Sequence, residues 1–128
     1  MRTAKHSTKV LLVDDEPNIL IAIAFLLEKE GYKVIKAQDG KQALAAMQQH
    51  QPNIAVLDVM MPGMDGFELA KRIRSNPAYE DTRIIFLTAK GTPNDRYRGY
   101  ATGGEVYLTK PFDNEELINT INEVVEFG

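Results

Sequence analysis

The sequence contains no cysteine among its 128 residues, which excludes disulfide bonds, thiolate metal sites and cysteine nucleophiles. It has no excess of positive charge: the net charge is −3 and the isoelectric point about 5.4, which argues against binding nucleic acid by phosphate neutralisation. The polar residues 1–9 are followed by no apolar signal region, and no apolar stretch is long enough to span a bilayer. We therefore expect a cytoplasmic protein with no nucleic-acid or membrane partner.

The chain shows no repeats, low-complexity segments or linkers, so we expect one domain over 1–128, with 1–8 as a flexible extension. Strand patterns alternate with helical patterns, which is typical of βα units around a parallel sheet. The strands are predicted at 10–13, 34–37, 53–57, 83–87 and 105–109. The helices are predicted at 16–30, from 40 to about 50, from 65 to about 76, at 94–101 and from 113 onward. The expected fold is a flavodoxin-like, doubly wound α/β fold with five parallel strands and five helices.

Four of the predicted strands end on residues that phosphate chemistry uses. The first runs into Asp14 and Asp15, the third into Asp58, the fourth into Thr88 and the fifth into Lys110. Ligands of open parallel sheets bind beyond the carboxyl ends of the strands. If the strands take the order 2-1-3-4-5, which we assume from other doubly wound sheets, these five side chains converge on one edge.

The converging set suits a divalent cation and a phosphoryl group. Neighbouring carboxylates repel one another, and a hard cation with oxygen ligands offsets that repulsion. We expect Asp14 and Asp15 to hold Mg²⁺, with Mn²⁺ as an alternative, and Asp58 to act as the nucleophile towards phosphorus. Lys110 would neutralise charge on the transferring oxygens, and Thr88 would donate a hydrogen bond.

Each of these residues also has an ordinary structural interpretation. Asp14 and Asp15 are suited to cap the following helix, and Asp58 is suited to a turn before Pro62-Gly63. Lys110 alone would be an exposed surface lysine. Their joint placement at matching strand ends favours a shared site over these separate roles.

At these positions the sequence resembles the receiver domain of two-component response regulators, from Lys9 to Phe127. The matching segments are LLVDDEP at 11–17, LDVMMPGMDG at 57–66, LTA at 87–89 and YLTKPF at 107–112. The resemblance implies that Asp58 accepts a phosphoryl group from a phosphohistidine of a sensor kinase or phosphotransfer protein. It further implies that Mg²⁺ is bound by Asp14, Asp15, Asp58 and the Met60 carbonyl, and that Lys110 contacts the phosphoryl group. Thr88 and Tyr107 would then be the switch pair, and the Lys110-Pro111 peptide bond would be cis.

The same resemblance implies self-catalysed phosphoryl uptake and slow hydrolysis, without turnover of a small molecule. Met60 and Lys90 would flank the attacking water and tune the lifetime of the phosphoryl group. The face formed by helix 94–101, strand 105–109 and the last helix would change shape for an unknown output partner, and would form a dimer when phosphorylated. Gly103-Gly104 departs from the family's usual Gly-Ala and loosens this region.

The first predicted helix is apolar on more than one face. We expect a core stripe and a docking stripe for the histidine-bearing partner, the core stripe being Ile19, Ile23, Leu26 and Leu27 and the docking stripe Leu20, Ile21, Ala24 and Phe25 together with Pro111 and Phe112. The alternative is that the last helix covers the second stripe. Tyr97, Arg98 and Tyr100 belong either to the output face or to an ordinary solvated helix.

Three other functions compete with a phosphoacceptor module. An Mg²⁺-dependent phosphohydrolase would use Asp58 transiently, but needs a general acid and a substrate-binding insertion that the sequence does not show. A flavodoxin-like cofactor binder would need a phosphate loop of small and hydroxyl residues after the first strand, where this chain has Asp-Asp-Glu-Pro. A receiver-like module that works without phosphate is disfavoured by the complete acid set.

Overall fold

The computed structural model describes residues 7–88, 100–101, 104, 106–109 and 113–127. Its five parallel strands form one sheet in the order β2-β1-β3-β4-β5, which confirms the strand order expected from the sequence. The strands are β1 (Lys9–Val13), β2 (Lys33–Ala37), β3 (Ile54–Asp58), β4 (Arg83–Thr88) and β5 (Val106–Thr109). The packed part of the chain includes Thr8, which is buried and whose carbonyl accepts a hydrogen bond from the Lys33 amide at 3.1 Å.

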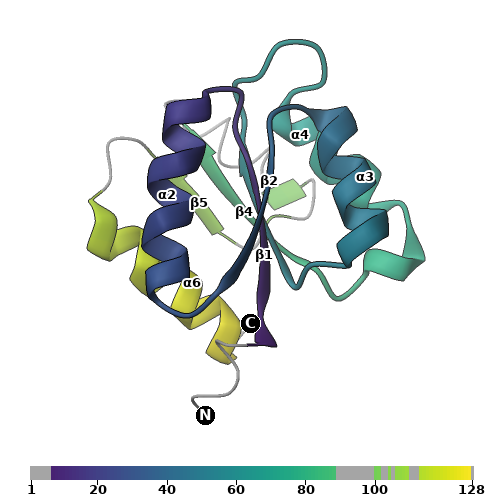
Figure 1. Ribbon diagram of the computed structural model, residues 1–128. Helices are drawn as coiled ribbons and strands as arrows, with labels where there is room; N and C mark the ends of the chain where they lie inside the picture. Colours follow the sequence, from purple (N-terminus) through teal and green to yellow (C-terminus); the bar gives the residue numbers. More distant parts are fainter. Residues whose placement is uncertain (1–6, 89–99, 102–103, 105, 110–112, 128) are drawn as a thin grey trace.

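Helices cover both faces of the sheet. Within the described residues they are α2 (Pro17–Lys29), α3 (Gly40–His50), α4 (Gly66–Arg74) and α6 (Asn114–Phe127), with a 3₁₀ turn at η1 (Pro77–Tyr79). Figure 1 shows α2 and α6 on one side of the sheet and α3 and α4 on the other. The helix predicted at 94–101 lies mainly in 89–99, outside the described residues; Tyr100 and Ala101 at its end are helical.

Aspartates begin three of the helices, as the sequence pattern indicates. The side chain of Asp65 accepts a hydrogen bond from the Glu68 amide at 2.9 Å, and Asp113 accepts one from the Glu116 amide at 2.7 Å. Asp39 caps α3 in the same way. These contacts satisfy amides that the first helical turn leaves without an intrahelical partner. They fix where each helix leaves its preceding loop.

The apolar strand runs form two core layers. All five residues of β3 are buried, which is typical of a parallel strand covered on both faces. One layer lies under α3 and α4 and includes Leu57, Phe67 and Tyr107. The other lies under α2 and α6. Among the described residues, none of the helices combines the length and the apolar composition needed to cross a bilayer.

The rotation of α2 corrects the predicted docking stripe. Leu20 and Ala24 are 3% and 2% exposed and belong to the core layer under this helix, so they cannot form a surface. Ile21 and Phe25 are 60% and 63% exposed. The core stripe of α2 is therefore Leu20, Ile23, Ala24 and Leu27. Of the four α2 residues predicted for docking, Ile21 and Phe25 remain as the exposed ones.

Candidate metal and phosphoryl site

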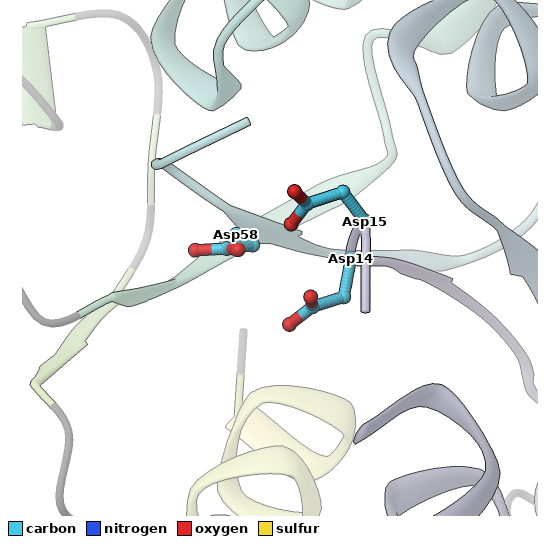
Figure 2. A group of neighbouring side chains, drawn as sticks. All are labelled: Asp14, Asp15 and Asp58. Atoms are coloured by element: carbon cyan, nitrogen blue, oxygen red, sulfur yellow. The ribbon is translucent and has the colours of Figure 1, made fainter. Parts of the chain in front are cut away.

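The pairing of β1 with β3 brings the three predicted carboxylates together. Val13 pairs with Leu57, so Asp14 and Asp58 follow at adjacent strand ends. Carboxylate oxygens of Asp14, Asp15 and Asp58 lie within 4.8 Å of one another. Figure 2 shows the three side chains gathered beyond β1 and β3. The sequence prediction of an acidic cluster at this edge is therefore confirmed in its geometry.

Two of the three acids are buried. Asp14 is 2% exposed and Asp58 is 5% exposed, whereas Asp15 is more accessible. The Glu16 amide donates to Asp14 Oδ1 at 2.9 Å, and the Met60 amide donates to Asp58 Oδ1 at 3.2 Å. These backbone contacts orient both carboxylates. Carboxylates this close together repel one another, and a bound cation would offset that repulsion.

The donor set fits a hard divalent cation. Mg²⁺ prefers oxygen ligands and typically binds to one or two carboxylates together with waters and a phosphate oxygen. Asp14, Asp15 and Asp58 supply carboxylate oxygens close enough to share one ion. The side chain of Met60 is 53% exposed beside this cluster, and its carbonyl as a further ligand stays a prediction.

The loop after β3 folds back tightly onto the phosphoacceptor candidate. The amides of Met61 and Gly66 both donate to the Val59 carbonyl, at 3.1 and 3.0 Å. Gly63 takes a φ of +76°, which is unfavourable for residues with a β-carbon. A β-carbon at Gly66 would lie 2.6 Å from the carbonyl oxygen of Asp58. The sequence analysis quoted Gly66 within a motif but assigned it no role; a glycine at the start of a capped helix is the signal that it missed.

Tyr107 is a buried residue within β5, on the same face of the sheet as α4. Its side chain is 3% exposed, and its ring centroid lies 5.9 Å from that of Phe86 and 6.4 Å from that of Phe67. The contact of Phe67 and Phe86 with Tyr107 was not predicted from the sequence. The register of β4 and β5 was the available signal for the pairing of Phe86 with Tyr107, because each of them precedes a strand-terminal threonine by two residues.

The remaining predicted site residues are only partly described. Thr88 ends β4, where its backbone pairs with Thr109 beside the strand that carries Asp58. Tyr100 is 50% exposed. The other predictions lie outside the described residues, namely those on Lys90, Tyr97, Arg98, Gly103, Lys110, Pro111 and Phe112, including the cis peptide at Lys110-Pro111.

Comparison with known proteins identifies the family to which this fold belongs. The family model described as the response regulator receiver domain matches residues 10–122. Protein PilG of Pseudomonas aeruginosa is 39% identical over 121 residues, a match that covers 94% of this chain and 90% of PilG. The solved structure of the chemotaxis protein CheY4 of Vibrio cholerae superposes with a TM-score of 0.87 at 38% identity, covering 91% of this chain and 98% of CheY4.

Other relatives are longer than this chain. The transcriptional regulatory protein TrcR of Mycobacterium tuberculosis is 42% identical over 110 residues, but the match covers 86% of this chain and only 42% of TrcR. The chain thus spans about half or less of several transcriptional regulators that it matches, although it spans nearly all of PilG. The family match and the three-carboxylate edge favour the receiver interpretation over a phosphohydrolase or a cofactor binder. The chain belongs to the response regulator receiver domain family of two-component systems.

Proposed function

We propose that Asp58 is the phosphoacceptor of this receiver domain and takes its phosphoryl group from a phosphohistidine. The observation that supports this most directly is the position of Asp58 at the end of the central strand β3, with the oxygens of Asp14 and Asp15 within 4.8 Å. A carboxylate is a competent nucleophile for an aspartyl-phosphate intermediate. The Met60 amide holds Asp58 Oδ1 in place for that attack.

In the proposed transfer, one oxygen of Asp58 attacks phosphorus while the bond from phosphorus to the histidine nitrogen breaks. The imidazole leaves with the electron pair and takes up a proton from water. Asp14, Asp15 and Asp58, with the Met60 carbonyl, would hold Mg²⁺ or Mn²⁺. A bound cation supplies charge neutralisation for the transferring phosphoryl oxygens. Asp58 is 5% exposed, so water reaches the resulting acyl phosphate slowly and hydrolysis regenerates the carboxylate.

The output step in this proposal uses Thr88 and Tyr107. A phosphorylated carboxylate adds about −1.5 to −2 charges and strong acceptor oxygens at pH 7. Thr88 lies at the end of the strand next to β3 and would donate to these oxygens, with Lys110 as the second contact. Tyr107 packs against Phe86 in the aromatic cluster. A change in the position of Tyr107 would alter the shape of the face formed by β5, α6 and residues 94–101. Dimerisation through that face belongs to the same proposal.

The proposed upstream partner is a histidine kinase or a histidine phosphotransfer protein. Exposed apolar patches often mark docking sites, and Ile21 and Phe25 form one on α2. The Lys29 ammonium lies 6.0 Å from the centre of the Phe25 ring and adds a positive rim. Pro111 and Phe112 would extend the patch, and the exchange would take place in the cytoplasm. The relatives include receiver-length proteins and longer transcriptional regulators, so the output partner stays undefined.

The test is incubation with acetyl phosphate and Mg²⁺ followed by intact mass spectrometry. The wild-type chain should gain one phosphoryl group, and the Asp58→Ala variant should gain none. Asp81→Ala removes an exposed acid that lies outside the cluster and should gain the group as the wild type does. Equal uptake by Asp58→Ala and wild type would refute the proposal.

A further inference from the structure

We propose that Phe67 is a positioning residue that couples the phosphoacceptor loop to Tyr107. This inference rests on the proposed function of Asp58 and Tyr107 and adds a route between them through α4. It assigns Phe67 a role beyond filling the core. Two contacts form this route, namely the start of α4 against Asp58 and Phe67 against Tyr107, and Phe86 packs against both rings.

The start of α4 is packed directly on the main chain of the phosphoacceptor. A β-carbon at Gly66 would lie 2.6 Å from the Asp58 carbonyl oxygen and 2.8 Å from the Val59 α-carbon. Both of these are backbone atoms, which cannot rotate away as a flexible side chain does. The Gly66 amide also donates to the Val59 carbonyl at 3.0 Å. A displacement of the peptide at 58–59 therefore shifts the first turn of α4.

Phe67 is the next residue and contacts Tyr107 on the face of the sheet that α4 covers. Phe67 is 1% exposed, and its ring is stacked with that of Tyr107 at an interplanar angle of 25° and a centroid separation of 6.4 Å. Asp58 and Tyr107 lie on strands separated by β4. Phe67 thus connects them across β4 through side-chain packing, without using the sheet hydrogen bonds.

The packing around these rings favours transmission of a shift. Phe67, Phe86 and Tyr107 belong to one buried cluster together with Leu57 and Val59, which flank the phosphoacceptor. Protein interiors are close-packed, so a ring displaced by a fraction of an ångström displaces its neighbours or opens a void. A stacked pair changes by repacking between discrete arrangements, as interfaces in switching proteins do. A shift of α4 therefore biases the position of Tyr107.

Phe86 supplies a matched control. It is 0% exposed and contacts both other rings, with centroid distances of 5.3 Å to Phe67 and 5.9 Å to Tyr107. It lies within β4, between Leu57 of β3 and Tyr107 of β5. Phe86 adjoins Leu87, whose carbonyl accepts a hydrogen bond from the Val59 amide at 3.4 Å, so it is connected to the phosphoacceptor through the sheet and not through α4. Phe86→Leu therefore removes the same volume from the same cluster and leaves the route through α4 intact.

The experiment follows the ¹⁹F resonance of Tyr107 in chains labelled with 3-fluorotyrosine, assigned with Tyr107→Phe. Each variant is titrated with acetyl phosphate and Mg²⁺, and phosphoryl uptake is measured on the same samples by intact mass. We expect wild type and Phe86→Leu to gain one phosphoryl group and to shift the Tyr107 resonance. Phe67→Leu should gain the same mass with the shift reduced to half or less, and Phe67→Met, which has an unbranched side chain, should give the same result.

The outcomes separate this inference from the proposed function. Failure of the wild-type chain to gain mass would refute the phosphoacceptor assignment itself. Normal mass gain without a Tyr107 shift in wild type would overturn the switch role and the inference with it. Normal mass gain with a full shift in Phe67→Leu or Phe67→Met, or an equal loss of the shift in Phe86→Leu, would overturn the inference alone.

Discussion

Gly66 lies so close to Asp58 that a β-carbon at position 66 would be 2.6 Å from the Asp58 carbonyl oxygen. Because Gly66→Ala must push α4 away from β3, it should lower the free energy of unfolding by about 1–3 kcal/mol, as overpacked sites do. It should also slow phosphoryl uptake, since the loop that orients Asp58 is displaced. Urea unfolding and the rate of mass gain with acetyl phosphate measure the two effects.

Gly31→Ala is the control for Gly66→Ala. Gly31 follows α2 at a φ of +104°, so an alanine there is strained and should cost about 1–2 kcal/mol of stability. The position is remote from the carboxylates, and its phosphoryl uptake should match that of wild type. Equal uptake rates in Gly66→Ala and Gly31→Ala would show that the close contact with Asp58 has no functional effect.

Magnesium should stabilise the folded chain because three carboxylates at one strand edge favour a cation in the folded state only. At about 100 times the dissociation constant, the free energy of unfolding should rise by about 2.7 kcal/mol. Asp14→Asn keeps an acceptor for the Glu16 amide but removes one charge from the cluster, so the rise should be much smaller. Thermal unfolding with and without magnesium measures it. Glu115→Gln, an exposed change of the same charge on α6, should keep the full rise, and its loss there would point to a non-specific charge effect.

Changes at the exposed residues Ile21 and Phe25 of α2 should slow phosphoryl transfer from the partner protein without slowing uptake from acetyl phosphate. Phe25→Ser or Ile21→Ser removes a side chain that is more than half exposed, so stability should change little. Transfer from a phosphorylated histidine domain should slow by about tenfold, which corresponds to the loss of about 1.4 kcal/mol of docking energy. Uptake from acetyl phosphate should stay unchanged. Stopped-flow transfer assays and intact mass measure the two rates.

Two further variants on the same helix define the boundaries of the patch. Leu20→Ser should destabilise the domain by about 2–5 kcal/mol because Leu20 is a core residue of α2. Ala22→Ser changes an exposed residue beside the pair and should leave transfer unaffected. If Phe25→Ser and Ile21→Ser transfer as fast as Ala22→Ser, the docking surface lies elsewhere.

Tyr32 predicts a loss of stability at high pH. Its side chain is 3% exposed and its hydroxyl donates to Asn122 Oδ1 on α6. Burial, and secondarily the negative charge of Glu30, raises the pKa of Tyr32 from 10.0 to about 12. Between these values the unfolded chain releases the proton while the folded chain keeps it, so stability is complete below pH 10 and falls as the pH rises towards 12.

The size of this loss is at most about 2.7 kcal/mol, since one pKa unit corresponds to 1.36 kcal/mol. Tyr32→Phe should be less stable at neutral pH by about 1 kcal/mol, because it loses the hydrogen bond to Asn122. It should also lack the Tyr32 contribution to the alkaline decline. Urea unfolding of both chains between about pH 9 and about pH 12 measures the difference. Parallel declines in the two chains would contradict the assignment to Tyr32.

The acidic edge was predictable because it depends on the strand ends, which the sequence shows, and on the strand order, which was assumed from other doubly wound sheets. Once Val13 and Leu57 are recognised as the last apolar residues of parallel neighbours, Asp14 and Asp58 must follow at the same edge. The helix starts at Asp65 and Asp113 were predictable for a similar reason: capping is a contact between residues three positions apart. A capping contact can be predicted without knowing how distant elements pack.

The rotation of α2 and the contacts of α4 were not predictable in this way. The run from Ile19 to Leu27 is apolar on every face, so helical periodicity does not decide whether Leu20 or Ile21 is buried. Packing against the sheet and α6 decides it, and it buries Leu20. The approach of Gly66 to Asp58 depends on how the loop between them folds back, which no residue spacing specifies.

The chemical identity of the phosphorylated residue tests the account most directly. Borohydride reduction converts an aspartyl phosphate to homoserine, and peptide mapping by tandem mass spectrometry then locates it. After treatment with acetyl phosphate and Mg²⁺, we predict homoserine at position 58, with none at positions 14 and 15 and none anywhere when EDTA is present. Homoserine at position 14 or 15, or labelling at position 58 that is unaffected by EDTA, would contradict the assignment of Asp58 as the nucleophile in a metal-holding acidic cluster.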